Sequence, residues 1–211
     1  MLASVTGRRS SLNVEGSTQP TSIDVIASAL EPLMPAVTRL SSPDGAVTLM
    51  VSDIADAEAI AERIGPDRWE RLISDHHVLV EKLLAHHDGE LLKVERDGFL
   101  AAFNSAHAGL HAAVDMQRTF SDAREQADAP GLGLRIGLHS GFLIASPDQP
   151  MGRNVVLAAR IAARARAGEI LVSSTLKQYT ETDPSFQFDL HGEYHFKGLL
   201  GEHTVYSVTR A

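Results

Sequence analysis

The sequence predicts an α+β protein with a ferredoxin-like β-α-β-β-α-β sandwich. Three observations carry this prediction: a buried strand pattern that leads into a helical one, two short apolar segments spaced as a hairpin, and a later alternation of strand and helix patterns. The chain has 211 residues, of which 44% are hydrophobic and 22% are charged. This is the balance of a globular protein with one core.

The chain divides into three predicted parts. Residues 1–21 lack a hydrophobic pattern and predict a flexible tail. Residues 22–45 predict a helical lead-in, with Ser22 or Asp24 as its cap and prolines that interrupt it, followed by a turn. Residues 46–211 predict the domain itself.

The first half of the domain alternates between strand and helix patterns. AVTLMVSDI, from Ala46, reads as a buried strand, and the region 55–87 has apolar residues at helical spacing. Residues 90–94 and 98–103 are short apolar segments with three residues between them. This spacing predicts a tight hairpin with Asp97 at its tip.

The second half adds further strands and helices. Helical spacing from Ala106 to Phe120 precedes the strand LGLRIGLHSG, and an alanine-rich helix follows over 152–165. EILVS predicts a buried strand, and 186–208 predicts short strands around two glycines. The resulting order is β-α-α-β-β-α-β-α-β with a small β addition.

Composition argues against several classes of protein. A formal charge of −8 without a cluster of basic residues is unsuited to nucleic-acid binding. No segment is apolar enough for a membrane span or a signal peptide, and the absence of cysteine suits the reducing cytoplasm. The histidine pairs at 76–77 and 86–87 lack the spacing of chelating residues, so we expect no zinc site.

Five segments together resemble the catalytic domain of class III adenylate and guanylate cyclases. They are VTLMVSDI, LLKVERDGFLAAF, LRIGLHSG, GRNVVLAARIAARARAGEILVSS and HFKGLLGEHTVYSV, which occur in that family's order between Ala46 and Val208. Each segment alone is weak evidence, but five in register are specific. The resemblance implies a bacterial soluble-type cyclase domain that acts on a nucleoside triphosphate.

By this resemblance, Asp53, the carbonyl of Ile54 and Asp97 hold two divalent cations, Mg²⁺ or Mn²⁺. Cyclisation needs one cation to acidify the attacking ribose 3′-hydroxyl and another to neutralise the triphosphate, and both prefer oxygen ligands. Taken singly, Asp53 is also typical of a helix cap and Asp97 of a hairpin turn. The two together within the five-segment register favour metal binding.

The resemblance also implies roles for cationic and polar side chains. Arg135 and Lys197 correspond to residues that contact the triphosphate, and Arg160 to the catalytic arginine that stabilises charge on the α-phosphate. Lys93 and Gln149 stand at the base-reading positions, where a lysine favours ATP over GTP. The alternative interpretation of each of these charged residues is a solvent-exposed surface charge without a role in substrate binding. The family builds its site between two chains, which implies a homodimer.

Four positions depart from the family pattern. Val156 replaces the helix asparagine that orients the ribose, and Arg96 replaces the glycine before the second aspartate. Asp56 and Glu58 put negative charge where a glycine-containing turn normally cradles phosphates. The sequence therefore leaves two hypotheses: a slow adenylate cyclase that makes cyclic AMP and pyrophosphate, or a non-catalytic cyclase-homology module for dimerisation or nucleotide-dependent regulation.

Overall fold

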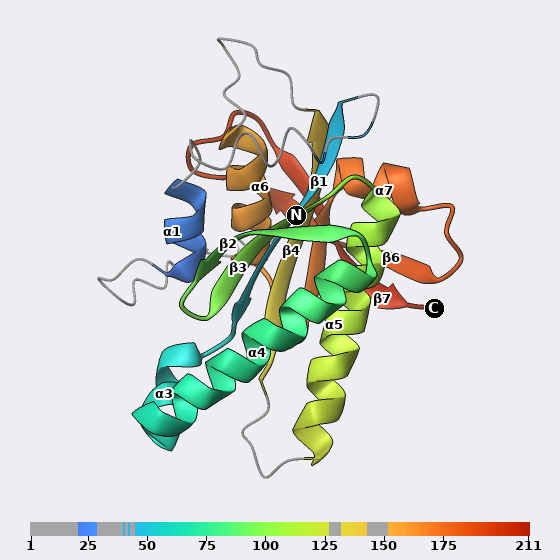
Figure 1. Ribbon diagram of the computed structural model, residues 1–211. Helices are drawn as coiled ribbons and strands as arrows, with labels where there is room; N and C mark the ends of the chain where they lie inside the picture. The colour runs from blue at the N-terminus through green and yellow to red at the C-terminus, as the bar shows by residue number, and fades with distance from the viewer. Residues whose placement is uncertain (1–20, 29–39, 41, 43–44, 127–131, 143–151) are drawn as a thin grey trace, which may run out of the picture.

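The computed structural model describes residues 21–28, 40, 42, 45–126, 132–142 and 152–211. They form a seven-stranded sheet with helices on both faces (Figure 1). The strands are β1 (Ala46–Ile54), β2 (Gly89–Glu95), β3 (Gly98–Phe103), β4 (Leu134–Phe142), β5 (Ile170–Ser173), β6 (Phe186–Tyr194) and β7 (His203–Arg210). The helices are α1 (Ser22–Ser28), α3 (Ala57–Ile64), α4 (Pro66–His86), α5 (Ala106–Gln126), α6 (Gly152–Ala162) and α7 (Ser174–Thr180).

The sheet has the strand order β2-β3-β1-β4-β5-β7-β6. In its first four strands, in the order β2-β3-β1-β4, each strand is antiparallel to its neighbours, which is the ferredoxin-like arrangement. β5 then pairs in parallel with β4, which requires a crossover, and α6 lies within that connection. The predicted fold class is confirmed.

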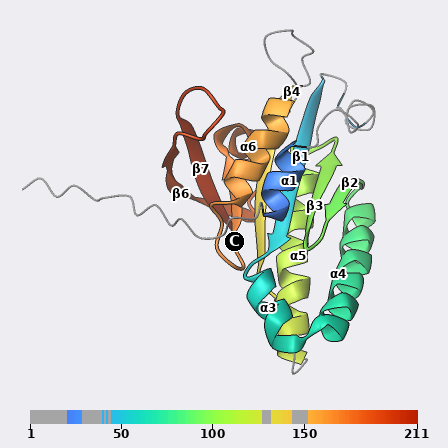
Figure 2. The same ribbon diagram turned by 90° about the vertical axis from the view of Figure 1, so that its left-hand side faces the viewer.

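Two apolar clusters sandwich the centre of the sheet. Helices α4, α5 and α7 cover one face, and α1 and α6 cover the other (Figures 1 and 2). Side chains alternate along β1, so Met50 and Ile54 enter the first cluster and Leu49 and Val51 the second. The second cluster, called here the α1–α6 cluster, consists of Ile23, Ile26, Val47, Leu49, Val51, Leu100, Ala102, Val155, Ala158, Ala159 and Ala162.

The close packing of α6 on the sheet explains a glycine in the middle of β4. A Cβ atom at Gly137 would lie 2.2 Å from the backbone nitrogen of Ala162 and 2.7 Å from the carbonyl oxygen of Ala158. Alanines on the helix and glycine on the strand therefore let the two backbones approach. This contact fixes the position of α6, and with it Arg160, relative to β4.

Three local features differ from the sequence prediction. The long helical region is broken at Gly65, whose φ of 82° is left-handed, and Pro66 starts the second helix. The short helix α7 was not predicted, because its seven residues are too few for a clear period; Ser173 caps it by accepting from the N–H of Leu176. Thr21, rather than Ser22 or Asp24, caps α1, since its hydroxyl accepts from the N–H of Asp24 at 3.2 Å.

The predicted hairpin is confirmed: β2 ends at Glu95 and β3 begins at Gly98. The lead-in helix ends at Ser28 within the described residues, and the segment 29–39 lies outside them. In the part of the chain that the structure describes, no helix combines the length and apolar character needed to cross a membrane.

Candidate active site

The two predicted metal-binding aspartates lie at the same end of the sheet, Asp53 on β1 and Asp97 in the turn between β2 and β3. Asp53 stands opposite Gly98 in the β1–β3 register, so Asp97 in the turn lies beside it. The N–H of Ile54, the last residue of β1, donates to the carbonyl oxygen of Asp97 at 3.2 Å. The β1–β3 pairing thus brings Asp53, Ile54 and Asp97 together, as the sequence predicted.

The guanidinium of Arg135 binds the carboxylate of Asp53 through two of its nitrogen atoms. The Nε atom donates to Oδ1 of Asp53 at 2.7 Å, and one terminal nitrogen donates to Oδ2. The register places Asp53 directly opposite Arg135 in the β1–β4 pair. Asp53 is only 2% exposed, so the guanidinium supplies the positive charge that a buried carboxylate requires.

Burial and charge act in opposite directions on this pair. Burial raises the pKa of Asp53 above its ordinary value, the guanidinium of Arg135 lowers it, and the nearby charge of Asp97 raises it again. The hydrogen bonds to Asp53 raise the pKa of Arg135 further. The pair therefore joins a buried carboxylate to a permanently charged guanidinium, with a second carboxylate close enough to influence both.

Asp97 contacts the N-terminal helix. The hydroxyl of Ser22, the first residue of α1, donates to Oδ1 of Asp97 at 2.5 Å. Gly98 makes room for this contact, because a Cβ atom there would lie 3.0 Å from the Cβ of Ser22 and 2.9 Å from the carbonyl oxygen of Ser52. Both predicted metal-binding carboxylates are thus engaged by side chains of the same chain.

Arg160 also contacts α1. Its Nη1 atom donates to Oδ1 of Asp24 at 3.3 Å, and both side chains are partly exposed. Val156 lies one helical turn earlier on α6 and is half-buried. Asn154 does not replace the missing asparagine, because its amide donates to the carbonyl of Phe142 at 3.1 Å and its oxygen lies 3.3 Å from Nε2 of His139.

The remaining predicted substrate-binding residues are less closely tied to the aspartates. Lys93 pairs with Leu100 across β2 and β3, which places it on the sheet face that α1 covers, and its ammonium lies 2.9 Å from Glu95. Lys197 is exposed in the β6–β7 connection, and none of the ion pairs among the described residues includes it. Gln149 lies outside the described residues.

The departures from the family pattern affect the backbone as well as the charge. Asp56 and Arg96 are both exposed, with φ values of 55° and 48°, in the left-handed region where glycine is least strained. Arg96 is the first of the two residues at the hairpin tip. A glycine at that position is what a type II′ turn favours, so Arg96 carries a conformational cost that glycine would remove.

Sequence reasoning missed Ser22 and Asp24, which it treated only as helix caps. Thr21 and Asp24 do form reciprocal capping hydrogen bonds, since the backbone N–H of Thr21 donates to Oδ2 of Asp24 at 3.2 Å. The local signal identifies the start of a helix. It holds no information about which distant residues that helix contacts.

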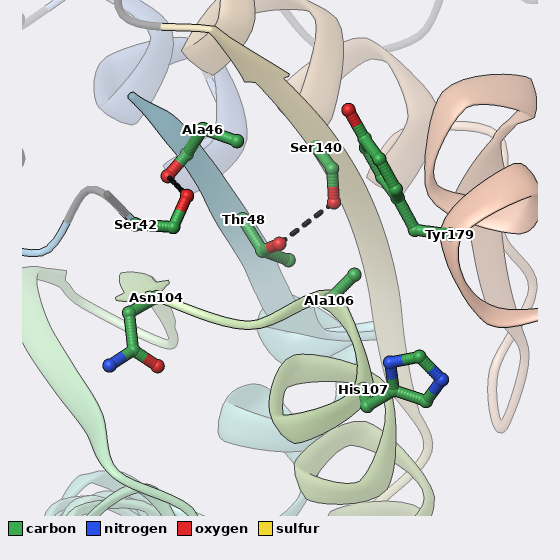
Figure 3. Close-up of a pocket in the computed structure, with 8 residues that line it drawn as sticks. All are labelled: Ser42, Ala46, Thr48, Asn104, Ala106, His107, Ser140 and Tyr179. Atoms are coloured by element: carbon green, nitrogen blue, oxygen red, sulfur yellow. Dashed lines mark hydrogen bonds between the residues drawn. The ribbon is translucent and has the colours of Figure 1, made fainter. Parts of the chain in front are cut away.

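A separate hollow lies at the other end of β1. It has a volume of about 270 Å³ and is lined in part by Thr48, His107, Ser140 and Tyr179, with the Thr48 and Ser140 hydroxyls 2.7 Å apart (Figure 3). Thr48 lies near the start of β1 and Asp53 near its end. The hollow is therefore distinct from the aspartate pair.

The described residues suit a divalent cation by donor type. Two carboxylates and a strand-end carbonyl meet at one place, and hard cations prefer such oxygen donors. A cation would displace Arg135 from Asp53 and Ser22 from Asp97, because those side chains hold the same oxygens. Among the described residues, no group of three or more His, Cys, Asp or Glu side chains gathers in a metal-binding arrangement.

Comparison with known proteins identifies the family. A model of the adenylate and guanylate cyclase catalytic domain matches residues 40–210, and the chain belongs to this family. The chain is 30% identical over 139 residues to an uncharacterized protein of Mycobacterium tuberculosis, covering 65% of this chain and 46% of that protein. It is 26% identical over 108 residues to adenylate cyclase 1 of Rhizobium meliloti, covering 46% of this chain and 16% of the relative.

The fold agrees with solved cyclase structures. The adenylyl cyclase CyaB from P. aeruginosa superposes with a TM-score of 0.70 at 20% sequence identity, covering 79% of this chain and 94% of that one. At this identity the likeness concerns the fold alone. The chain spans less than half the length of the curated relatives it matches.

Proposed function

We propose that this domain converts ATP to cyclic AMP and pyrophosphate, slowly, at a site between two copies of the chain in the cytoplasm. The observation that carries the proposal is the meeting of Asp53, on β1, with Asp97, in the β2–β3 turn, and with Arg135 beside Asp53. Carboxylates so arranged suit two divalent cations, and a guanidinium suits a triphosphate. Membership of the cyclase family supports the same chemistry.

Each residue has a distinct part in the proposed reaction. Asp53, Asp97 and the Ile54 carbonyl hold Mg²⁺ or Mn²⁺, which when bound would acidify the ribose 3′-hydroxyl and neutralise phosphate charge. Arg135, once released from Asp53, is free to bind triphosphate oxygens. Arg160 stabilises the negative charge that develops on the α-phosphate.

Substrate selection rests on other side chains. Lys93 lies on the same sheet face as Asp53, where its ammonium can donate to N1 of adenine. Gln149 would assist at the base edge. Lys197, in the exposed β6–β7 connection, would contact the triphosphate in the homodimer. This set of donors favours ATP over GTP, because a lysine cannot accept the hydrogen bond that guanine N1 offers.

A non-catalytic role is the second candidate, and one observation favours it. Arg135 already donates to both oxygens of Asp53, so the charge of this carboxylate is balanced without a cation. Val156 also offers no hydrogen bond to a ribose. A domain that dimerises and responds to a nucleotide without turning it over would need neither cation binding nor a ribose contact.

Product formation separates the two candidates. We expect purified protein at micromolar concentration to form cyclic AMP from ATP and Mn²⁺, with Asp53→Ala and Asp97→Ala abolishing the product and GTP giving less product than ATP. Equal product from Asp53→Ala would implicate a contaminant and refute the proposal. ATP binding by equilibrium dialysis without any product would establish the non-catalytic candidate instead.

A further inference from the structure

Helix α1 lies directly over the candidate active site. Its Ser22 hydrogen-bonds to Asp97, and its Asp24 hydrogen-bonds to Arg160. The proposed function assigns a metal-binding role to Asp97 and a catalytic role to Arg160. Figure 2 shows the helix beside α6 on the sheet face opposite α4 and α5. Two residues in the first turn of α1 thus contact Asp97 and Arg160.

The helix is anchored by apolar contacts. Ile23 is 2% exposed and Ile26 is fully buried, and both pack in the α1–α6 cluster against β1, β3 and α6. The polar contacts are weaker, because the Asp24–Arg160 pair is partly exposed to solvent. The isoleucines hold the helix in place, and Ser22 and Asp24 set where its first turn points.

The helix is also short enough to be removable. Seven residues are too few for a stable helix in water, so α1 forms only while it packs on the domain. The domain does not depend on α1 in the same way, because the main cluster on the other face of the sheet contains no α1 residue. Release of α1 would therefore expose one apolar face while leaving the larger core intact.

We propose that α1 is an intramolecular cap that competes with the metal–nucleotide substrate for this site. In the capped state Ser22 holds an oxygen of Asp97 that a cation needs, and Asp24 holds Arg160 away from a phosphate. In the uncapped state Asp97 and Arg160 face the substrate. The identity of the substrate rests on the proposed function, whereas the release of α1 does not.

Thiol labelling tests the release directly, because the chain contains no cysteine. Single cysteines at Ile26 and Val172 are a matched pair, since both side chains are fully buried but Val172 lies in the central strand β5. We expect Ile26→Cys to react with a thiol reagent at least 100-fold faster than Val172→Cys. Ser22→Cys, which keeps both isoleucines, should also react faster than Val172→Cys. Equal, slow labelling of all three would overturn the proposal.

The polar contacts should control this release. Adding Asp24→Asn to Ile26→Cys removes one contact of the cap while the labelled site stays the same. We expect labelling to accelerate about threefold or more, with no change when Asp24→Asn is added to Val172→Cys. Unchanged labelling at Ile26→Cys would show that Asp24 does not hold the cap and would count against the proposal.

Substrate competition is tested with Mn²⁺ and ATP in the same assay. Saturating Mn²⁺ and ATP should accelerate labelling of Ile26→Cys severalfold and leave Val172→Cys unchanged. ATP that binds, as measured by equilibrium dialysis, without accelerating the labelling would overturn the competition. If ATP binds to neither the parent nor the Asp24→Asn form, the proposed function is wrong, while fast labelling without ligand still supports a releasable helix.

Discussion

The guanidinium of Arg135 holds both carboxylate oxygens of Asp53, directly across the β1–β4 register. The proposed function gives these two residues separate partners, a cation for the aspartate and a triphosphate for the arginine. Here each serves as the partner of the other. The guanidinium supplies the positive charge that a carboxylate only 2% exposed requires.

The first prediction concerns the removal of the arginine. Arg135→Ala should lower the free energy of unfolding by about 3 kcal/mol, because an unpaired carboxylate is left buried. Mn²⁺ should then restore stability, because it supplies the lost positive charge. At a free Mn²⁺ concentration one hundred times the dissociation constant, the gain should be about 2.7 kcal/mol. Urea denaturation with and without Mn²⁺ measures both effects.

A double variant provides the control for this prediction. Asp53→Asn with Arg135→Gln removes both charges and should recover much of the lost stability while abolishing the response to Mn²⁺. A Mn²⁺ response of equal size in the double variant would mean that the cation binds elsewhere, and would contradict the assignment of Asp53.

The second prediction concerns the hairpin tip. Arg96→Gly should raise the free energy of unfolding by about 1 kcal/mol, since glycine adopts the left-handed φ of 48° without the steric cost that arginine bears. Arg96→Ala removes the same charge but keeps a Cβ atom, so it should give no such gain. Thermal or urea unfolding of the two variants checks the difference, and equal stability would show that charge, not backbone conformation, matters at this position.

The third prediction concerns His76, which lies in the core between α4 and the sheet. It is 2% exposed, neither ring nitrogen has a hydrogen-bond partner among the described residues, and its ring packs near Phe99 and Phe120. Burial lowers the pKa of His76 to about 4. The unfolded chain therefore binds a proton between pH 6.5 and 4 that the folded chain does not, and stability falls as the pH falls through this range.

His76→Leu should remove this part of the pH dependence and raise the free energy of unfolding at pH 7 by about 1–2 kcal/mol, the cost of a buried unpaired polar group. His139 is the matched contrast, because burial also lowers its pKa to about 4 but it has hydrogen-bond partners in Ser173 and Asn154. His139→Leu should destabilise the protein at pH 7. Urea midpoints between pH 4.5 and 7.5 test both; identical slopes for His76→Leu and the parent would contradict the prediction.

Local periodicity predicted most of the fold because it reports burial directly. β1 and β3 are mainly apolar runs that are buried on both faces, and the alanines of α6 recur at the spacing of the helix face they bury. The features that local periodicity did not predict are either short elements or elements that depend on one backbone dihedral angle. Helix α7 has only seven residues, about two turns, and the break at Gly65 requires a positive φ that glycine permits but does not dictate.

The sequence predicted only those parts of the candidate site that local structure determines. Asp53 and Asp97 follow from a strand end and a hairpin turn, so local pattern and family resemblance suffice to bring them together. The partners of these carboxylates come from α1 and β4, which lie 75 and 82 positions away in the sequence. Such contacts depend on tertiary packing, so they cannot be deduced from the spacing of residues within a single helix or strand.

The last prediction returns to Val156, which lies on α6 one turn before Arg160. Val156→Asn should raise cyclic AMP formation at least about tenfold, because a single well-placed hydrogen-bond donor in an active site is worth on the order of 10²–10³ in rate. Val156→Ala is the control, since it makes space without adding a donor and should not raise the rate. The increase should appear in kcat, as expected for a contact that orients the ribose for attack. If the two variants turn over ATP equally, the valine is not what limits this site, and the α1 contacts become the stronger explanation for slow turnover.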